Sequence, residues 1–206
     1  IRTEELINFI DYDYAEPQAK PNAVHAEMSQ SPWSQGNRLL RIGLKGKSIP
    51  SNALPPSNFV FLIDVSGSMN SDDKLGLLRQ AFSRFVDELD AQDRIAIVTY
   101  ASNPGVLLPS TSGAEKEVIK AAIAELRAGG STNGEGGIIT AYEIAQQGFI
   151  EGGNNRVILG TDGDFNVGVS SQEELIALIE EKRELGVFLT ILGVGSGNLQ
   201  DGLMEQ

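Results

Sequence analysis

The feature that most constrains the fold is an unbroken apolar run, residues 59–63, that ends abruptly in polar side chains. Its aromatic and β-branched members predict a strand buried on both faces, as at the centre of a parallel sheet. Asp64, Ser66 and Ser68 follow at alternate positions and carry hard oxygen donors, which favour Mg²⁺, Mn²⁺ or Ca²⁺ over zinc or copper. The stretch therefore predicts a divalent-metal site at a strand end or, more simply, polar caps of the next helix.

The chain after this run alternates between apolar strands and amphipathic helices. Further strands are expected at residues 93–100, 106–108, 155–160 and 187–194, and helices at residues 73–90, 112–128, 137–149 and 171–185. Ser112 and Glu115 are expected to form a capping box, and Gly129-Gly130 to end that helix. The alternation predicts a doubly wound, mostly parallel α/β sheet flanked by helices, as in Rossmann-like folds.

The first part of the chain, residues 1–57, is expected to form a small appendage. A short amphipathic helix is predicted at residues 3–10, and alternating apolar residues at 24–28 and 40–44 predict a β-hairpin. Prolines at 50, 55 and 56 indicate a linker. We therefore expect two parts, residues 1–57 and residues 58–206.

Composition excludes several classes of site. The chain has no cysteine, which rules out disulfides and thiolate zinc sites. Its only histidine, His25, lies far from the other polar clusters on a predicted half-exposed strand, which disfavours a Ser-His-Asp triad. A net charge of −12 repels phosphate backbones, so no nucleic-acid partner is expected. No apolar run is long enough for a transmembrane segment.

Two later segments carry matching oxygen donors. Asp162 follows the predicted strand at residues 155–160, and Thr132 lies in a glycine-rich loop. The carboxyl ends of parallel strands lie along one edge of a sheet, so Asp64 and Asp162 can share one site.

These three segments together resemble the metal-ion-dependent adhesion site of von Willebrand factor type A (VWA) domains, and the resemblance covers residues 58–206. It implies a divalent ion, Mg²⁺ or else Mn²⁺ or Ca²⁺, and a protein-binding role in which the ion accepts an Asp or Glu carboxylate of a partner. Its implied metal ligands are Asp64, Ser66, Ser68, Thr132 and Asp162. Met69 and Phe165 flank the predicted site and could contact the partner.

Residues 4–14 also resemble the segment that precedes this domain in bacterial envelope proteins, often lipoproteins. The resemblance implies a location in the cell envelope, periplasmic or extracellular, and we expect the targeting segment to lie outside this sequence. The family's domain ends in another strand, so residues 58–206 are expected to be truncated before it.

Two other functions stay open at this stage. A metal-assisted hydrolase would need a general base, for which Asp164 and Glu135 are the candidates. A purely structural envelope domain would leave the site without a ligand. Ser71 and Lys74 match a Ser-x-x-Lys hydrolase pattern, but a serine at a predicted helix start is expected to act as a cap. We therefore expect a binding module rather than an enzyme.

Overall fold

The structure, a computed structural model, describes residues 3–50, 53–101, 104–130, 134–163 and 172–195. The chain forms two units, residues 1–54 and residues 55–206, and each is described by itself. None of the described helices is long and apolar enough to cross a membrane.

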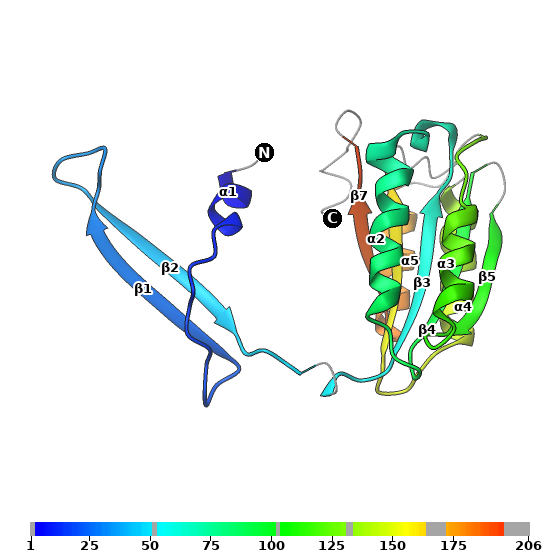
Figure 1. The fold of residues 1–206 in the computed structure, drawn as a ribbon, viewed down its shortest axis with the longest axis horizontal. Helices are drawn as coiled ribbons and strands as arrows, with labels where there is room; N and C mark the ends of the chain where they lie inside the picture. The colour runs from blue at the N-terminus through cyan, green and yellow to red at the C-terminus, as the bar shows by residue number, and fades with distance from the viewer. Residues whose placement is uncertain (1–2, 51–52, 102–103, 131–133, 164–171, 196–206) are drawn as a thin grey trace. The chain divides into compact units, whose positions relative to one another are not determined.

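A five-stranded sheet forms the centre of the larger unit (Figure 1), with the order β5-β4-β3-β6-β7. Its strands are β3 (Ser57–Asp64), β4 (Arg94–Tyr100), β5 (Gly105–Ser112), β6 (Asn154–Thr161) and β7 (Val187–Gly193). Four strands are parallel, and β5 pairs antiparallel with β4 at the edge. The predicted doubly wound, mostly parallel sheet is confirmed, and the apolar run at residues 59–63 is its central strand.

Helices cover both faces of this sheet (Figure 1), and they are α2 (Leu77–Asp87), α3 (Lys116–Glu125), α4 (Gly134–Gln147) and α5 (Gln172–Glu184). The alternation of β3 side chains divides the core in two. Phe61 and Ile63 pack with the apolar side chains of α2 and α3, whereas Val60 and Leu62 pack with those of α4 and α5. The central strand is therefore buried on both faces, as its sequence predicts.

The capping box expected at Ser112 and Glu115 is wrong. Ser112 is the last residue of β5, and its hydroxyl donates to the Ala91 carbonyl at 2.9 Å. Glu115 is the N-cap of α3, without a side-chain cap hydrogen bond. The helix also ends at Glu125, before the Gly129-Gly130 pair. Ser112 belongs to β5 rather than to the helix because the pairing of β5 with β4 extends to this residue.

The smaller unit contains the expected helix, α1 (Thr3–Phe9), and the expected antiparallel hairpin of β1 (Asn22–Gln30) and β2 (Arg38–Gly46). His25 is half-buried on β1 and stacks on Tyr14 with ring centroids 4.8 Å apart. Alternate positions on the strands carry exposed apolar side chains, namely Val24, Met28, Leu40, Ile42 and Leu44. Cross-strand pairing places these residues on one face of the hairpin.

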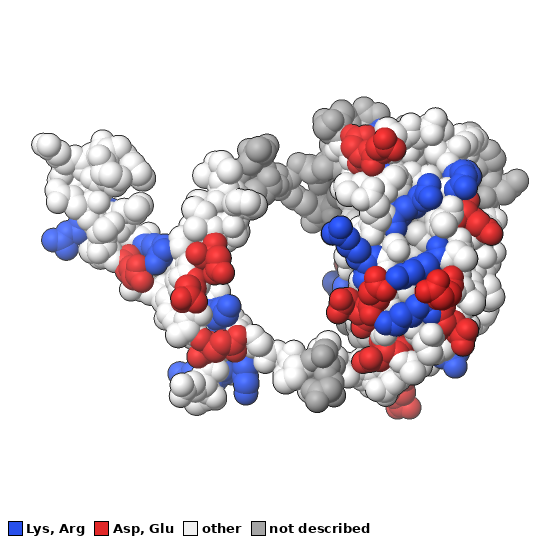
Figure 2. Space-filling view, in the orientation of Figure 1, with Lys and Arg blue, Asp and Glu red and all other residues white. Residues whose placement is uncertain are grey.

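Charged side chains on the larger unit are mixed in sign. Figure 2 shows Lys and Arg interspersed with Asp and Glu over the face that α2 and α3 form. One pair on this face joins Lys120 of α3 to Asp87 of α2 at 2.5 Å. Neither sign forms a continuous patch in this view.

Substitution of Tyr142 tests the packing of α4. Its side chain is 1% exposed, and its hydroxyl has no partner among the described residues. Burial raises the pKa of Tyr142 from 10.0 to about 12. The folded state thus favours the protonated phenol more strongly than the unfolded state does. The stability that the protonated phenol contributes is complete below pH 10 and is lost as the pH rises towards 12. Tyr142→Phe should therefore be at least as stable at pH 7, because it removes an unpaired buried hydroxyl.

The Phe variant should also lose less stability than the unmutated protein between pH 10 and 12, by up to roughly 2–3 kcal/mol. Urea unfolding at pH 7 and across this alkaline range measures the difference. Tyr12→Phe, in the separate N-terminal unit, is the control. Equal alkaline losses in the unmutated protein and Tyr142→Phe would contradict the prediction.

Candidate metal centre

Asp64 lies at the carboxyl end of β3 between two hydroxyl groups of the neighbouring strands. The parallel register pairs Asp64 with Tyr100 of β4 and the preceding Ile63 with Gly160 of β6. The hydroxyls of Tyr100 and Thr161 each donate to Asp64 Oδ2 at 3.2 Å. The Asp64 residue is 0% exposed, so the sheet holds this carboxylate in a fixed orientation away from solvent.

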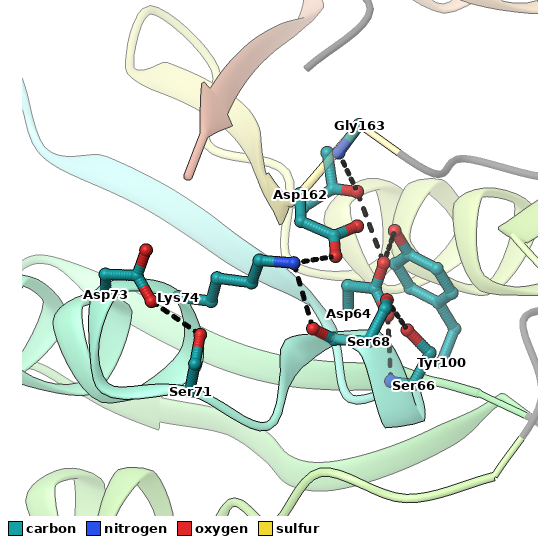
Figure 3. A network of polar contacts seen from close by, with 10 residues as sticks. Asp64, Ser66, Ser68, Ser71, Asp73, Lys74, Tyr100, Asp162 and Gly163 are labelled. Carbon is teal, nitrogen blue, oxygen red and sulfur yellow. Dashed lines mark hydrogen bonds and ion pairs between the residues drawn. The ribbon is translucent and has the colours of Figure 1, made fainter. Parts of the chain in front are cut away.

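The two serines continue from the strand into a 3₁₀ turn at Gly67–Met69 (Figure 3). The backbone N–H of Ser66 donates to Asp64 Oδ1 at 2.8 Å. The Ser66 and Ser68 hydroxyls lie 3.0 Å apart. Ser66 is buried and Ser68 is exposed, so the pair leads from the buried carboxylate to the surface.

The second carboxylate, Asp162, follows the end of β6 and has a completely buried side chain. Lys74 Nζ lies 2.9 Å from Asp162 Oδ2 and donates to the Ser68 carbonyl at 3.0 Å. Figure 3 shows the lysine side chain extending to the Asp162 carboxylate and to the turn that carries Ser68. Four of the five sequence-predicted metal ligands, Asp64, Ser66, Ser68 and Asp162, thus lie together at one edge of the sheet.

The electrostatic setting follows from the burial of both acids. Burial raises the pKa of the Asp64 carboxyl, hydrogen bonds from Ser66 oppose the rise, and the charge of Asp162 adds to it. Burial, together with the nearby Asp64 charge, also raises the pKa of Tyr100. The Tyr100 phenol therefore stays protonated and remains a donor to Asp64. A cation placed here would relieve the repulsion between the two acids.

The remaining predicted residues have different outcomes. Thr132, Phe165 and Asp164 lie outside the described residues, as does the side chain of Glu135. The segment before Thr132 does reach the site, because Gly67 N–H donates to the Gly130 carbonyl at 3.1 Å and Gly129 N–H donates to the Val65 carbonyl at 2.7 Å. Met69 is completely buried and belongs to the core on the α2 face, so we do not include it among the partner contacts proposed below.

The Ser-x-x-Lys pattern does not assemble a nucleophile and its base. The Ser71 hydroxyl donates to Asp73 at 2.6 Å, whereas the Lys74 ammonium binds Asp162 and the Ser68 carbonyl. Ser71 precedes a π-helical turn at Asp72–Gly76 without a side-chain cap hydrogen bond. Ser71 thus occupies the expected N-cap position, but its hydroxyl does not cap the turn.

Three contributors to the site were missed in the sequence. Tyr100 and Thr161 end the strands on either side of Asp64, and the rule that parallel strand ends share an edge would have identified both. No comparable sequence rule identifies Lys74. Its ammonium reaches Asp162 only because of the path that the chain takes between Ser68 and α2.

The groups present fit a hard divalent cation. The described donors are carboxylate and hydroxyl oxygens, the ligands that Mg²⁺, Mn²⁺ and Ca²⁺ prefer. A positive group, the Lys74 ammonium, already binds Asp162 in this structure, so the edge accommodates positive charge. A bound cation would be held by Asp64, Ser66, Ser68 and Asp162 and would supply an electrophilic centre for an incoming oxygen ligand.

Comparisons with known proteins agree with this geometry. The model of the von Willebrand factor type A domain matches residues 58–205, which is more than half of the chain. The chain belongs to the VWA family. A further model, described as von Willebrand factor, matches residues 1–41. VWA domains commonly mediate protein–protein interactions, and they often bind a divalent metal.

Curated relatives of this VWA protein are much longer than the chain. The uncharacterized protein YfbK of Escherichia coli (strain K12) is 43% identical over 99% of this chain and 37% of its own length. Inter-alpha-trypsin inhibitor heavy chain H4 of Homo sapiens is 29% identical over 68% of this chain and 16% of its own length. The chain thus spans well under half of these relatives.

Solved structures support the VWA fold. BatB from Bacteroides thetaiotaomicron has a TM-score of 0.59 at 20% identity, over 72% of this chain and 83% of its own. Proximal thread matrix protein 1 from the mussel byssus, with a zinc-occupied metal-ion-dependent adhesion site, has a TM-score of 0.60 at 22% identity, over 74% of this chain and 41% of its own.

The contact between α4 and β4 gives a test of how the site is supported. A Cβ added at Gly137 would lie 2.7 Å from Cβ of Tyr100, the residue that donates to Asp64. Gly137→Ala should destabilise the fold by about 1–3 kcal/mol through overpacking, even though alanine favours a helix over glycine by about 1 kcal/mol. Urea unfolding measures the change.

Gly136→Ala is the matched control in the same helix, because its added Cβ would lie 3.1 Å from Pro104 Cγ and does not touch the site. We expect a smaller loss for this variant. Gly137→Ala with unchanged or increased stability would show that the helix does not constrain Tyr100.

Proposed function

We propose that this VWA domain is a divalent-metal-dependent protein-binding module. Its ion is held by Asp64, Ser66, Ser68, Thr132 and Asp162, and an open position on the ion accepts an Asp or Glu carboxylate of a partner protein. The observation that carries this proposal is the gathering of two buried carboxylates and two serine hydroxyls at one sheet edge. Thr132, and Phe165 as an apolar contact to the partner, enter the proposal from the family pattern alone.

The chemistry of the donors supports Mg²⁺ as the ion, with Mn²⁺ or Ca²⁺ as the alternatives. The described donors are oxygen atoms, and the chain has no cysteine and a single histidine that lies in the other unit. Zinc prefers nitrogen and sulfur ligands. The neighbouring mussel structure has zinc at its adhesion site, so zinc belongs in the metal series of any test.

The proposed role is binding rather than catalysis. Hydroxyl ligands are neutral and do not cancel the positive charge of the ion. Because only a few of the proposed ligands are carboxylates, the ion stays electrophilic and can accept a carboxylate of a partner. The VWA relatives include an inter-alpha-trypsin inhibitor heavy chain, and the structural neighbours include a matrix protein.

We also propose a location in the cell envelope. In support, a neighbour with a TM-score of 0.53 at 23% identity is an aerotolerance-related membrane protein of Bacteroides fragilis.

Thermal unfolding in metal tests the ion. A ligand that binds only the folded state stabilises it by about 2.7 kcal/mol at 100 times its dissociation constant, which corresponds to a rise in Tm of roughly 5–10 °C for a chain of this size. We expect this rise with Mg²⁺ or Mn²⁺ and its loss in Asp64→Asn. The asparagine keeps an acceptor for Ser66 N–H but removes the buried charge.

Asp73→Asn is the matched control, because Asp73 lies near the site in sequence but its carboxylate accepts from Ser71 instead (Figure 3). This variant should keep the full metal-dependent rise. A flat Tm across millimolar metal in the unmutated protein would favour a structural role for the domain. A full rise in Asp64→Asn would place the ion elsewhere.

Affinity capture from an envelope extract tests the partner carboxylate. The immobilised domain should retain a protein in Mg²⁺ and release it in EDTA, because the ion bridges the two proteins. Excess acetate should also release the bound protein, by competing for the open position, whereas equal chloride should not. Asp64→Asn should retain nothing and Asp73→Asn should behave as the unmutated domain. Retention that persists in EDTA would contradict a metal-bridged contact.

A further inference from the structure

Lys74 reaches the site through an unusual stretch of chain. A π-helical turn, Asp72–Gly76, separates the serine turn from α2. Within it the Ser71 carbonyl accepts from both Lys74 N–H at 3.2 Å and Gly76 N–H at 3.4 Å. Turns of this type are rare and occur frequently at functional sites. Here the turn carries Lys74, whose side chain extends to the buried Asp162 carboxylate (Figure 3).

The lysine side chain is held by packing as well as by charge. It is 18% exposed, and its ammonium lies between Asp162 Oδ2 at 2.9 Å and the Ser68 carbonyl at 3.0 Å. Gly195, with φ +86°, lies against its stem, since a Cβ added there would be 2.7 Å from Lys74 Cε. This is a partly buried ion pair with a defined geometry, unlike a mobile surface pair.

The ammonium supplies one positive charge against the two carboxylates of Asp64 and Asp162. Both acids are buried, and a buried carboxylate without a compensating charge is costly. A divalent ion bound by the same acids would therefore meet a fixed positive charge next to one of its ligands. Electrostatics makes the two cations compete for Asp162.

We propose that Lys74 is a tethered competitor of the divalent ion. Its ammonium neutralises Asp162 while no ion is bound, and it lowers the affinity of the site for the ion. This inference rests on the proposed function, because it concerns the same metal site. The lysine thus stabilises the metal-free fold at the expense of metal affinity.

Calorimetric titration with MgCl₂ tests this proposal on the Lys74→Met and Lys74→Gln variants. Methionine keeps the length of the stem without charge or donor, whereas glutamine keeps an uncharged donor. Both should bind Mg²⁺ more tightly by about tenfold, equal to about 1.4 kcal/mol. Both should also have a lower Tm in EDTA, with the larger loss in Lys74→Met. Lys120→Met, which removes the lysine of α3 that pairs with Asp87 of α2, should leave the Mg²⁺ dissociation constant unchanged.

The titration separates a competitor from a merely structural lysine, because a structural role predicts a lower Tm without tighter metal binding. An equal or weaker affinity in both variants would overturn the inference while leaving the proposed metal site intact. Binding that is detectable only in the variants would support the inference. No binding in any of the proteins would overturn the proposed function and this inference together.

Discussion

The burial of the Asp64 carboxylate at the end of the central strand is the constraint on which the site depends. A buried charge requires polar partners, and the parallel register of β3 with β4 and β6 supplies the Tyr100 and Thr161 hydroxyls to one of its oxygens. The Ser66 backbone N–H binds the other oxygen. The strand alignment that closes the hydrophobic core therefore also orients the Asp64 carboxylate.

The second acid makes this arrangement an electrostatic compromise. Two buried carboxylates at one edge repel each other, which opposes folding. Lys74 compensates Asp162 through a contact with little exposure to solvent. The edge that we propose as a cation site thus carries two buried acids, and the single charge of Lys74 compensates only part of their negative charge. Natural proteins keep destabilising arrangements of this kind, here the repulsion between two buried carboxylates, mainly at functional sites.

Much of the fold could be predicted from the sequence because its signals are local. The apolar run before Asp64, the amphipathic stripe of α2 and the alternation of apolar and amphipathic segments indicated the type and order of the elements. The rule on parallel strand ends correctly predicted that Asp64 and Asp162 lie at one edge. The capping box predicted at Ser112 was wrong because this residue pairs with Arg94 of β4 and belongs to β5. A local capping pattern contains no information about pairing with a distant strand.

The sequence by itself determined the α/β class, the central strand and the chemistry of the oxygen donors, since each depends on residue type and local order. Only the tertiary structure decided which groups surround those donors. Tyr100 meets Asp64 through the register of β4, and Lys74 meets Asp162 through a π-helical turn and the space left by Gly195. These contacts join residues 36 and 88 positions apart, and their distances depend on how strands and helices pack rather than on spacing along the chain.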